Sequence, residues 1–228
     1  MSVVALVPAA GRGERLGESV PKALVPVRGV PLLVHAVRGL LSARGRGSTG
    51  CVWRVVVAAP VSDVDTARNA LAAAGLPALV VAGGSSRTES VRLALDAAGD
   101  ATIVLVHDAA RAFTPPEIIY NVVSAVTAGA PAVIPVLPVA DTVKRVDASG
   151  MVVGTPDRSE LRVVQTPQGF AADVLRRAYA TYPDDSTTDD AGLVERLGVP
   201  ITTIPGHPFA MKITTSFDLA LAETMFPG

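Results

Sequence analysis

A glycine-rich segment with basic side chains follows the first apolar run of the chain. Residues 3–7 form a short, uninterrupted apolar run that ends at Pro8, which is typical of a buried parallel strand. Gly11 and Gly13 then allow the backbone to turn tightly and to point its N–H groups at an anion. Three basic side chains lie close by in the sequence: Arg12, Arg15 and Lys22. This pattern predicts a phosphate-binding loop, and a nucleoside triphosphate is the ligand that suits it.

The glycine spacing separates this segment from two common phosphate-binding loops. Gly11, Gly13 and Gly17 lie one residue further apart than in the dinucleotide fingerprint, and no Gly-Lys-Ser/Thr follows to make a P-loop. A glycine-rich turn that binds no ligand is the alternative. Residues 1–54 carry eight basic and two acidic side chains, an excess of six positive charges, although the whole chain has a net charge of −1. This local excess favours a polyanionic small molecule.

Other polar segments also follow apolar runs, where ligands bind in open α/β sheets. Residues 83–90 offer glycines and hydroxyl groups that could surround a base or ribose, or cap the next helix. Residues 165–168 and 187–190 add amide and hydroxyl groups, which are suited to substrate contacts or to helix caps and turns.

A carboxylate follows the apolar run 103–106. Asp108 at the end of a buried strand needs a cation, so it either pairs with Arg111 or binds Mg²⁺ and substrate hydroxyls, and the nearby triphosphate loop favours Mg²⁺. Lys212 follows the last expected strand and either reaches the same crevice or is an ordinary solvated charge near a helix start. The helix dipole disfavours a cation there, which favours a functional role. His107 and His35 are interpreted as structural, because an attacking phosphate oxygen is already ionised and requires no base.

The elements that position these residues alternate regularly. Apolar β-type runs at 52–59, 78–82, 102–106 and 132–136 are separated by helical patterns near 63–74, 88–98 and 116–128. We therefore expect an α/β fold: a single Rossmann-like, doubly wound, mostly parallel sheet. We expect the whole of residues 1–228 to form one domain.

The pattern changes between about 138 and 164. Alternating residues around the turn at 148–150 predict an antiparallel β-arm that leaves the domain and carries exposed charges. A protruding hairpin is stable only when another surface covers it, and a partner subunit is the simplest such surface. We therefore expect a homodimer that forms through this arm.

Composition excludes several other classes of protein. Apolar residues make up 49% of the 228 residues, but Pro, Gly or charge interrupts every apolar run, so no membrane span is expected. No secretory signal is evident, and the single cysteine, Cys51, excludes an internal disulfide, so we expect a cytoplasmic protein. Near-neutral charge and 4% aromatic residues argue against a nucleic-acid partner.

Taken in order, the motifs resemble those of the 2-C-methyl-D-erythritol 4-phosphate cytidylyltransferases of the non-mevalonate isoprenoid pathway. The matching motifs are Pro8-Ala-Ala-Gly-x-Gly-x-Arg15 with Pro21-Lys22, Gly84-x-x-Arg87-x-x-Ser90, His107-Asp-Ala-Ala-Arg111, Asp141-Thr-Val-Lys144, Gln165-Thr-Pro-Gln168, Thr188-Asp189 and Lys212-Ile-Thr. The first motif is shared by sugar nucleotidyltransferases in general. His-Asp-Ala-Ala-Arg combined with Gln-Thr-Pro-Gln is much narrower. Ala210 and Met211 stand where the family commonly has Asp-Asn.

The resemblance implies roles for individual residues. The residues around CTP would be Ala9, Ala10, Gly11, Gly13, Gly83 and Ser90, with Asp108 near the ribose and Mg²⁺. Catalytic charge neutralisation at the triphosphate would come from Arg15, Lys22 and Lys212. The methylerythritol phosphate would contact Thr166, Thr188 and Lys212 of one subunit, and Thr142 and Arg158 of the other.

Two alternatives stay open at this stage. A ribitol-5-phosphate cytidylyltransferase shares the fold, the nucleotide site and the mechanism, and differs mainly in the acceptor site and the arm. A catalytically inactive nucleotide-binding module belongs to a different class. The joint presence of Arg15, Lys22, Asp108 and Lys212 argues against it, because binding alone would not require all four.

Overall fold

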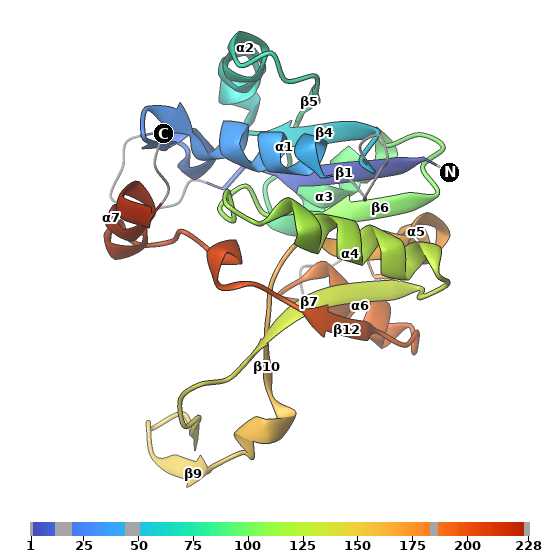
Figure 1. The fold of residues 1–228 in the computed structure, drawn as a ribbon. Helices are drawn as coiled ribbons and strands as arrows, with labels where there is room; N and C mark the ends of the chain where they lie inside the picture. The colour runs from blue at the N-terminus through green and yellow to red at the C-terminus, as the bar shows by residue number, and fades with distance from the viewer. Residues whose placement is uncertain (1, 12–19, 44–50, 183–186, 226–228) are drawn as a thin grey trace.

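The fold is built on one eight-stranded mixed sheet (Figure 1). The computed structural model describes residues 2–11, 20–43, 51–182 and 187–225. Four strands form the parallel part of the sheet: β1 (Val3–Pro8), β4 (Arg54–Ala59), β5 (Leu79–Ala82) and β6 (Ile103–Val106). Strand β1 lies between β4 and β6, and β5 pairs with the outer edge of β4. The apolar runs therefore form the parallel core that the sequence predicts.

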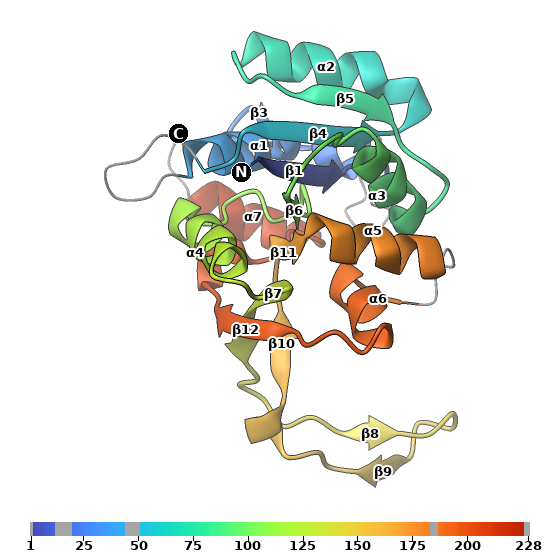
Figure 2. The ribbon, with the colours of Figure 1, turned by 90° about the vertical axis from the view of Figure 1, so that its right-hand side faces the viewer.

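Helices cover both faces of this sheet. The helices on one face are α1 (Leu32–Ser42), α2 (Val64–Ala73) and α4 (Pro116–Thr127). Those on the other are α3 (Arg87–Asp96), α5 (Ala172–Thr181) and α6 (Asp190–Arg196) (Figure 2). Along β1, Val3, Ala5 and Val7 pack into the first core and Val4 and Leu6 into the second. The doubly wound arrangement is confirmed.

The second half of the sheet departs from simple alternation. Strand β11 (Gln168–Ala171) runs antiparallel between β6 and β7 (Ala132–Pro138), and β12 (Thr202–Pro205) pairs in parallel with β7. Sequence analysis does not predict β11. Gly169 leaves room for α4, because a Cβ at this position would lie only 2.3 Å from a methyl carbon of Val122. The helix therefore packs directly onto the backbone of this strand.

The antiparallel arm protrudes from the sheet, as the sequence predicts (Figures 1 and 2). Strand β7 leads into it, β8 (Arg145–Val146) and β9 (Val152–Gly154) form a small hairpin, and β10 (Arg162–Val164) returns antiparallel to the end of β7. Val146, Met151 and Val152 on the hairpin are each more than half exposed. The arm thus presents an apolar surface outside the main body.

Short elements complete the chain. They are η2 (Lys22–Leu24), β2 (Pro26–Val27), β3 (Val30–Pro31), η3 (Val61–Asp63), η4 (Arg158–Glu160), η5 (Pro208–Ala210) and α7 (Ser216–Met225). A small core that includes Val25, Ile213 and Ala222 packs α7 against the segment around β2. Within the described ranges, no helix has the length and apolar character needed to cross a membrane.

Candidate active site

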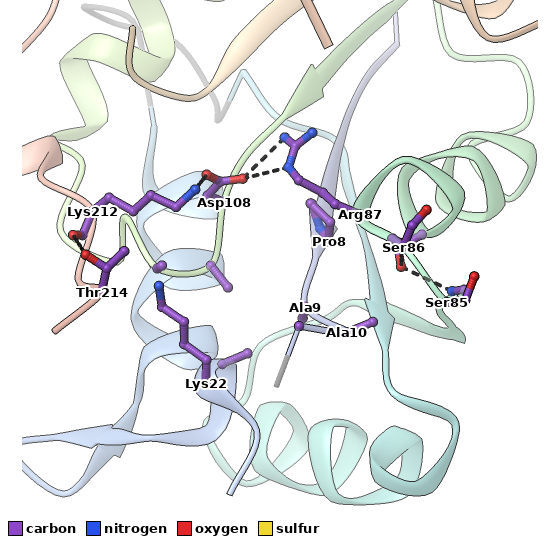
Figure 3. Close-up of a pocket in the computed structure, with 16 residues that line it drawn as sticks. Pro8, Ala9, Ala10, Lys22, Ser85, Ser86, Arg87, Asp108, Lys212 and Thr214 are labelled. Atoms are coloured by element: carbon purple, nitrogen blue, oxygen red, sulfur yellow. Dashed lines mark hydrogen bonds and ion pairs between the residues drawn. The ribbon is translucent and has the colours of Figure 1, made fainter. Parts of the chain in front are cut away.

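A cavity of about 300 Å³ lies beyond the carboxyl ends of β1 and β6 (Figure 3). Its walls come from the end of β1, η2, the start of α3, the segment after β6 and the segment before α7. The charged side chains that line it are Lys22, Arg87, Asp108 and Lys212. The fold therefore brings together segments from both ends of the chain at the edge where open α/β sheets bind ligands.

The carboxylate of Asp108 lies between two cations in this cavity. One of its oxygens, Oδ2, is 2.7 Å from Lys212 Nζ, and Oδ1 accepts hydrogen bonds of 3.3 Å from Nε and Nη2 of Arg87. Burial by itself would raise the pKa of Asp108, but the positive charges of Arg87 and Lys212 lower this pKa well below its usual range. Asp108 is therefore ionised at neutral pH.

The alternative in which Asp108 pairs with Arg111 is wrong, because the ion pairs of Asp108 are with Arg87 and Lys212. The guanidinium of Arg111 donates to the carbonyl oxygens of Ala210, at 2.7 Å, and Val164, at 3.1 Å. Arg111 thus joins the returning end of the arm to the segment that carries Lys212. Asp108 instead meets cations that lie far from it in the sequence.

Arg87 is a site residue whose role the sequence analysis does not assign. It begins α3, lines the cavity and contacts both Asp108 and the buried carboxylate of Asp190. Burial alone would lower the pKa of Arg87, but the negative charges of Asp190 and Asp108 raise it. The sequence does carry a signal for this role, because Arg87 is a cation in the polar motif Gly84-x-x-Arg87 that follows an apolar strand.

The opening loop contributes small residues to the cavity. Ala9, Ala10 and Gly11 line it directly, and the side chain of Lys22 points into it (Figure 3). Gly13 and Arg15 lie outside the described residues, so their predicted roles stay predictions.

The segment after β5 serves mainly to build the cavity wall. A Cβ at Gly83 would lie 2.8 Å from Ala10 Cβ and 3.0 Å from Ser90 Oγ, so glycine permits the two loops to touch. Gly83 lines an adjoining groove, and Ser90 lines the cavity itself. Ser86 caps α3 by accepting a hydrogen bond from the Glu89 N–H, which is the capping alternative left open by the sequence.

Thr166 and His107 form a buried support behind Asp108. Thr166 Oγ1 accepts a 3.0 Å hydrogen bond from the Asp108 N–H and lies 3.1 Å from His107 Nδ1. The peptide bond between Thr166 and Pro167 is cis. Burial lowers the pKa of His107 to about 4, so its imidazole is neutral at pH 7. These contacts support the structural interpretation of His107. His35 also contacts the backbone, with Nε2 3.1 Å from the Val27 carbonyl oxygen.

Thr166 is buried behind Asp108 and does not line the cavity, and three further predicted acceptor-site residues lie away from it in the single chain. Thr142 and Arg158 are exposed on the arm, and the Arg158 guanidinium donates to the Ala140 carbonyl oxygen. Thr188 is exposed just before α6. The cavity lining includes none of the three.

The donors available to a metal ion are few. Across the described ranges, no group of three or more His, Cys, Asp and Glu side chains is placed to hold a metal. Among the residues that the structure describes, Asp108 is the carboxylate that lines the cavity. A single carboxylate suits Mg²⁺ when substrate phosphates and water supply the remaining ligands.

Open α/β sheets bind ligands at the carboxyl ends of their strands, and the basic side chains of this cavity suit a phosphorylated ligand, as in the nucleotidyltransferases. Residues 3–227 match the profile of the IspD family, described as 2-C-methyl-D-erythritol 4-phosphate cytidylyltransferase. The chain belongs to this family of cytidylyltransferases, enzymes of the non-mevalonate isoprenoid pathway.

Individual relatives agree with this assignment. The chain is 62% identical to the 2-C-methyl-D-erythritol 4-phosphate cytidylyltransferase of Saccharopolyspora erythraea, with 99% of each chain covered. It is 58% identical to that of Nocardia farcinica, over 98% of this chain and 94% of the relative. Among solved structures, the enzyme from Thermus thermophilus is 34% identical with a TM-score of 0.79, covering 99% of this chain and 98% of that one.

The low pKa of His107 predicts a specific pH dependence of stability. Between pH 6.5 and about 4 the unfolded chain binds a proton that the native imidazole does not, so the free energy of unfolding falls as pH falls, by up to about 1.4 kcal/mol per pH unit. We expect His107→Gln to have a shallower loss of stability than the wild type between pH 6.5 and 4.5, measured by urea unfolding.

The matched control is His35→Gln, which removes an imidazole outside the cavity. The window stays above the range in which Asp108 takes up its proton, because the pKa of that carboxyl is lowered in the native state. An unchanged pH slope in His107→Gln would contradict the buried, neutral imidazole.

Proposed function

We propose that the cavity is where the chain carries out the cytidylyltransferase reaction of its family. CTP and 2-C-methyl-D-erythritol 4-phosphate would give 4-diphosphocytidyl-2-C-methyl-D-erythritol and pyrophosphate. The observation that carries the proposal is the convergence of Lys22, Arg87 and Lys212 around Asp108, beside the glycine-rich loop. Such a cavity suits a ligand that carries several negative charges together with hydroxyl groups.

The nucleotide would occupy the part of the cavity formed by the opening loop and the start of α3. Ala9, Ala10 and Gly11 have little or no side chain, so a ligand can approach their backbone closely. Close packing of Gly83 against Ala10 limits the space behind the loop. Ser90 and Asp108 would lie near the base and the ribose.

The chemistry requires positioning and charge neutralisation. An ionised phosphate oxygen of the acceptor attacks the α-phosphorus of CTP; the new P–O bond forms as the bond to the β-phosphate bridge breaks, and pyrophosphate leaves with those electrons. Lys22 and Lys212 would neutralise charge on the phosphates during transfer. His107 lies outside the cavity lining and its lowered pKa makes it a weak base, which agrees with a reaction that needs no protein base.

A magnesium ion fits this arrangement. Asp108 would hold it together with triphosphate oxygens, and the ion would supply positive charge that screens the phosphates. Both carboxylate oxygens of Asp108 contact cations here, but the Lys212 side chain is 43% exposed. Lys212 therefore has room to move from Asp108 to the triphosphate and release one carboxylate oxygen.

The acceptor would lie between two subunits of a homodimer. Thr166, Thr188 and Lys212 would come from one protomer, and Thr142 and Arg158 from the arm of its partner. Support comes from the arm itself, because Val146, Met151, Val152 and Val153 are between 51% and 67% exposed and need a covering surface. Thr142 and Arg158 lie on the arm and outside the cavity lining of their own chain, which agrees with a role at the partner's cavity.

The activity can be tested by pyrophosphate release with CTP and Mg²⁺. We expect release with 2-C-methyl-D-erythritol 4-phosphate and much slower release with ribitol 5-phosphate at equal concentration. Preference for ribitol 5-phosphate would overturn the acceptor assignment. Binding of CTP without release from either acceptor would indicate an inactive nucleotide-binding module.

Loss of a cavity lysine should slow turnover. We expect Lys22→Ala and Lys212→Ala each to lower kcat by about 10²–10³, by analogy with the loss of a transition-state charge donor. Arg68→Ala is the matched control, because Arg68 is an exposed cation on α2 that pairs with Asp65. Unchanged turnover in either folded lysine variant would refute its catalytic role.

A mixing experiment tests whether the arm acts across subunits. Lys212→Ala damages the cavity and Arg158→Ala damages the arm, so a mixed dimer contains one site with both changes and one intact site. After subunit exchange, an equal mixture should recover about a quarter of wild-type activity, because half of the dimers are mixed and each has one intact site. A mixture of Lys22→Ala and Lys212→Ala should recover none. Failure of the first mixture to recover while exchange is observed would exclude the crossed arm.

A further inference from the structure

We propose that Asp190 is a positioning residue that holds Arg87 away from a tight pair with Asp108, and so keeps the Asp108 carboxylate available to CTP. The inference rests on the proposed role of the cavity as the CTP site. It assigns a function to a buried carboxylate that neither lines the cavity nor contacts the expected substrates.

Asp190 is a completely buried charge at the start of α6. Its side chain has no exposed surface; Oδ2 accepts a 2.7 Å hydrogen bond from Arg87 Nη2, and Oδ1 accepts a 2.5 Å hydrogen bond from the Tyr179 hydroxyl. Burial of a charge is costly unless it is paired and hydrogen-bonded. An apolar residue would fill the same space without this cost, so the carboxylate requires an explanation beyond packing.

The contacts of Arg87 show what Asp190 does. Its Nη2 lies 2.7 Å from Asp190, whereas both of its contacts to Asp108 measure 3.3 Å and reach the same oxygen, Oδ1. The guanidinium is therefore held on the Asp190 side and shares only one Asp108 oxygen. The second oxygen of Asp108 faces Lys212, whose side chain is partly exposed. A ligand can therefore take the place of Lys212 at this oxygen without displacing Arg87.

Loss of the charge on Asp190 would change this balance. A guanidinium with a single carboxylate partner prefers a bidentate pair, in which it donates hydrogen bonds to both carboxylate oxygens. Arg87 would then move toward Asp108 and occupy the oxygen that now faces Lys212. CTP would have to break this pair, so its affinity would fall.

The same carboxylate links the two halves of the site. Asp190 follows directly after Thr188 and Asp189, and Gln168 of β11 donates to Asp189 Oδ2 at 2.7 Å and accepts from the Ala191 N–H at 2.9 Å. The start of α6 is thus fixed both to the strand after Thr166 and to Arg87. We expect a change at Asp190 to shift Thr188 as well, and hence to affect the acceptor.

The test is Asp190→Asn, which keeps the shape of the side chain and removes its charge. CTP affinity is measured by calorimetry without acceptor, and KM for each substrate and kcat are measured by pyrophosphate release. We expect CTP affinity to fall about 10- to 100-fold, as for loss of an outer partner of a site residue, with a smaller rise in KM for the acceptor. Wild-type CTP affinity in a folded Asp190→Asn protein would overturn the inference.

Tyr179→Phe is the matched control. It removes the hydrogen bond to the other oxygen of Asp190 and leaves the pair with Arg87 in place. Its melting temperature should fall while CTP affinity stays within about twofold of wild type. An equal loss of CTP affinity in Tyr179→Phe would mean that Asp190 acts only by stabilising the fold.

Two further measurements separate the inference from the proposed function. In an Arg87→Gln background, Asp190→Asn should cause little additional loss of CTP affinity. If instead the double variant loses affinity by the product of the two single losses, Asp190 does not act through Arg87.

If Asp190→Asn fails to fold, Arg87→Lys provides the test. A lysine ammonium lacks the planar guanidinium group with which Arg87 contacts two carboxylates at once. We expect it to weaken CTP binding, and unchanged binding would overturn the inference. Inactivity of the wild type with both acceptors would instead contradict the proposed function.

Discussion

The site depends on the need to neutralise one carboxylate at the end of a buried strand. Asp108 follows β6 and is largely withdrawn from water, so its charge is tolerated only beside cations. Arg87 comes from the start of α3 and Lys212 from the segment before α7. These two side chains meet Asp108 because the fold brings their segments to the end of β6. The packing that forms the fold therefore also assembles the site.

The cations around Asp108 differ in their freedom, and this difference suits them to different tasks. Arg87 is anchored by a buried acid and is a fixed part of the wall. Lys212 is the more exposed of the two and has room to follow a substrate. Arg111, between them in the sequence, braces the segment of Lys212 through the carbonyl of Ala210. An arginine anchored by a second carboxylate and a more exposed lysine on the same carboxylate suit a site that is preorganised and can still exchange partners.

Much of the fold could be predicted from the sequence, because apolar runs and helical patterns follow from burial on two faces of a sheet. Strand β11 could not, since Gln168 and Gly169 interrupt its apolar character and its identity as a strand comes from its neighbours β6 and β7. The positions of Asp108, Lys22 and Lys212 were predictable because each follows an apolar strand or a glycine-rich loop. The partner of Asp108 was not, because Arg111 is nearer in sequence while Arg87 is nearer in space.

The sequence also could not reveal the importance of Asp190. A run of Thr and Asp residues before a helix is typical of a cap, and Asp189 does cap α6. The side chain of Asp190, the next residue, is instead buried and pairs with Arg87 of α3. Adjacent identical residues thus have different roles because successive side chains of a helix start face different directions.

Strand β11 has a mechanical consequence for the whole molecule. It is hydrogen-bonded to β6 on one edge and to β7 on the other, so a single continuous sheet joins the wall that carries Asp108 to the half that carries the arm. A hinge between these halves would have to break that ladder of backbone hydrogen bonds. The continuous sheet therefore resists bending between its two halves. We expect side chains and connecting segments at the ends of the strands to make the adjustments that successive ligands require.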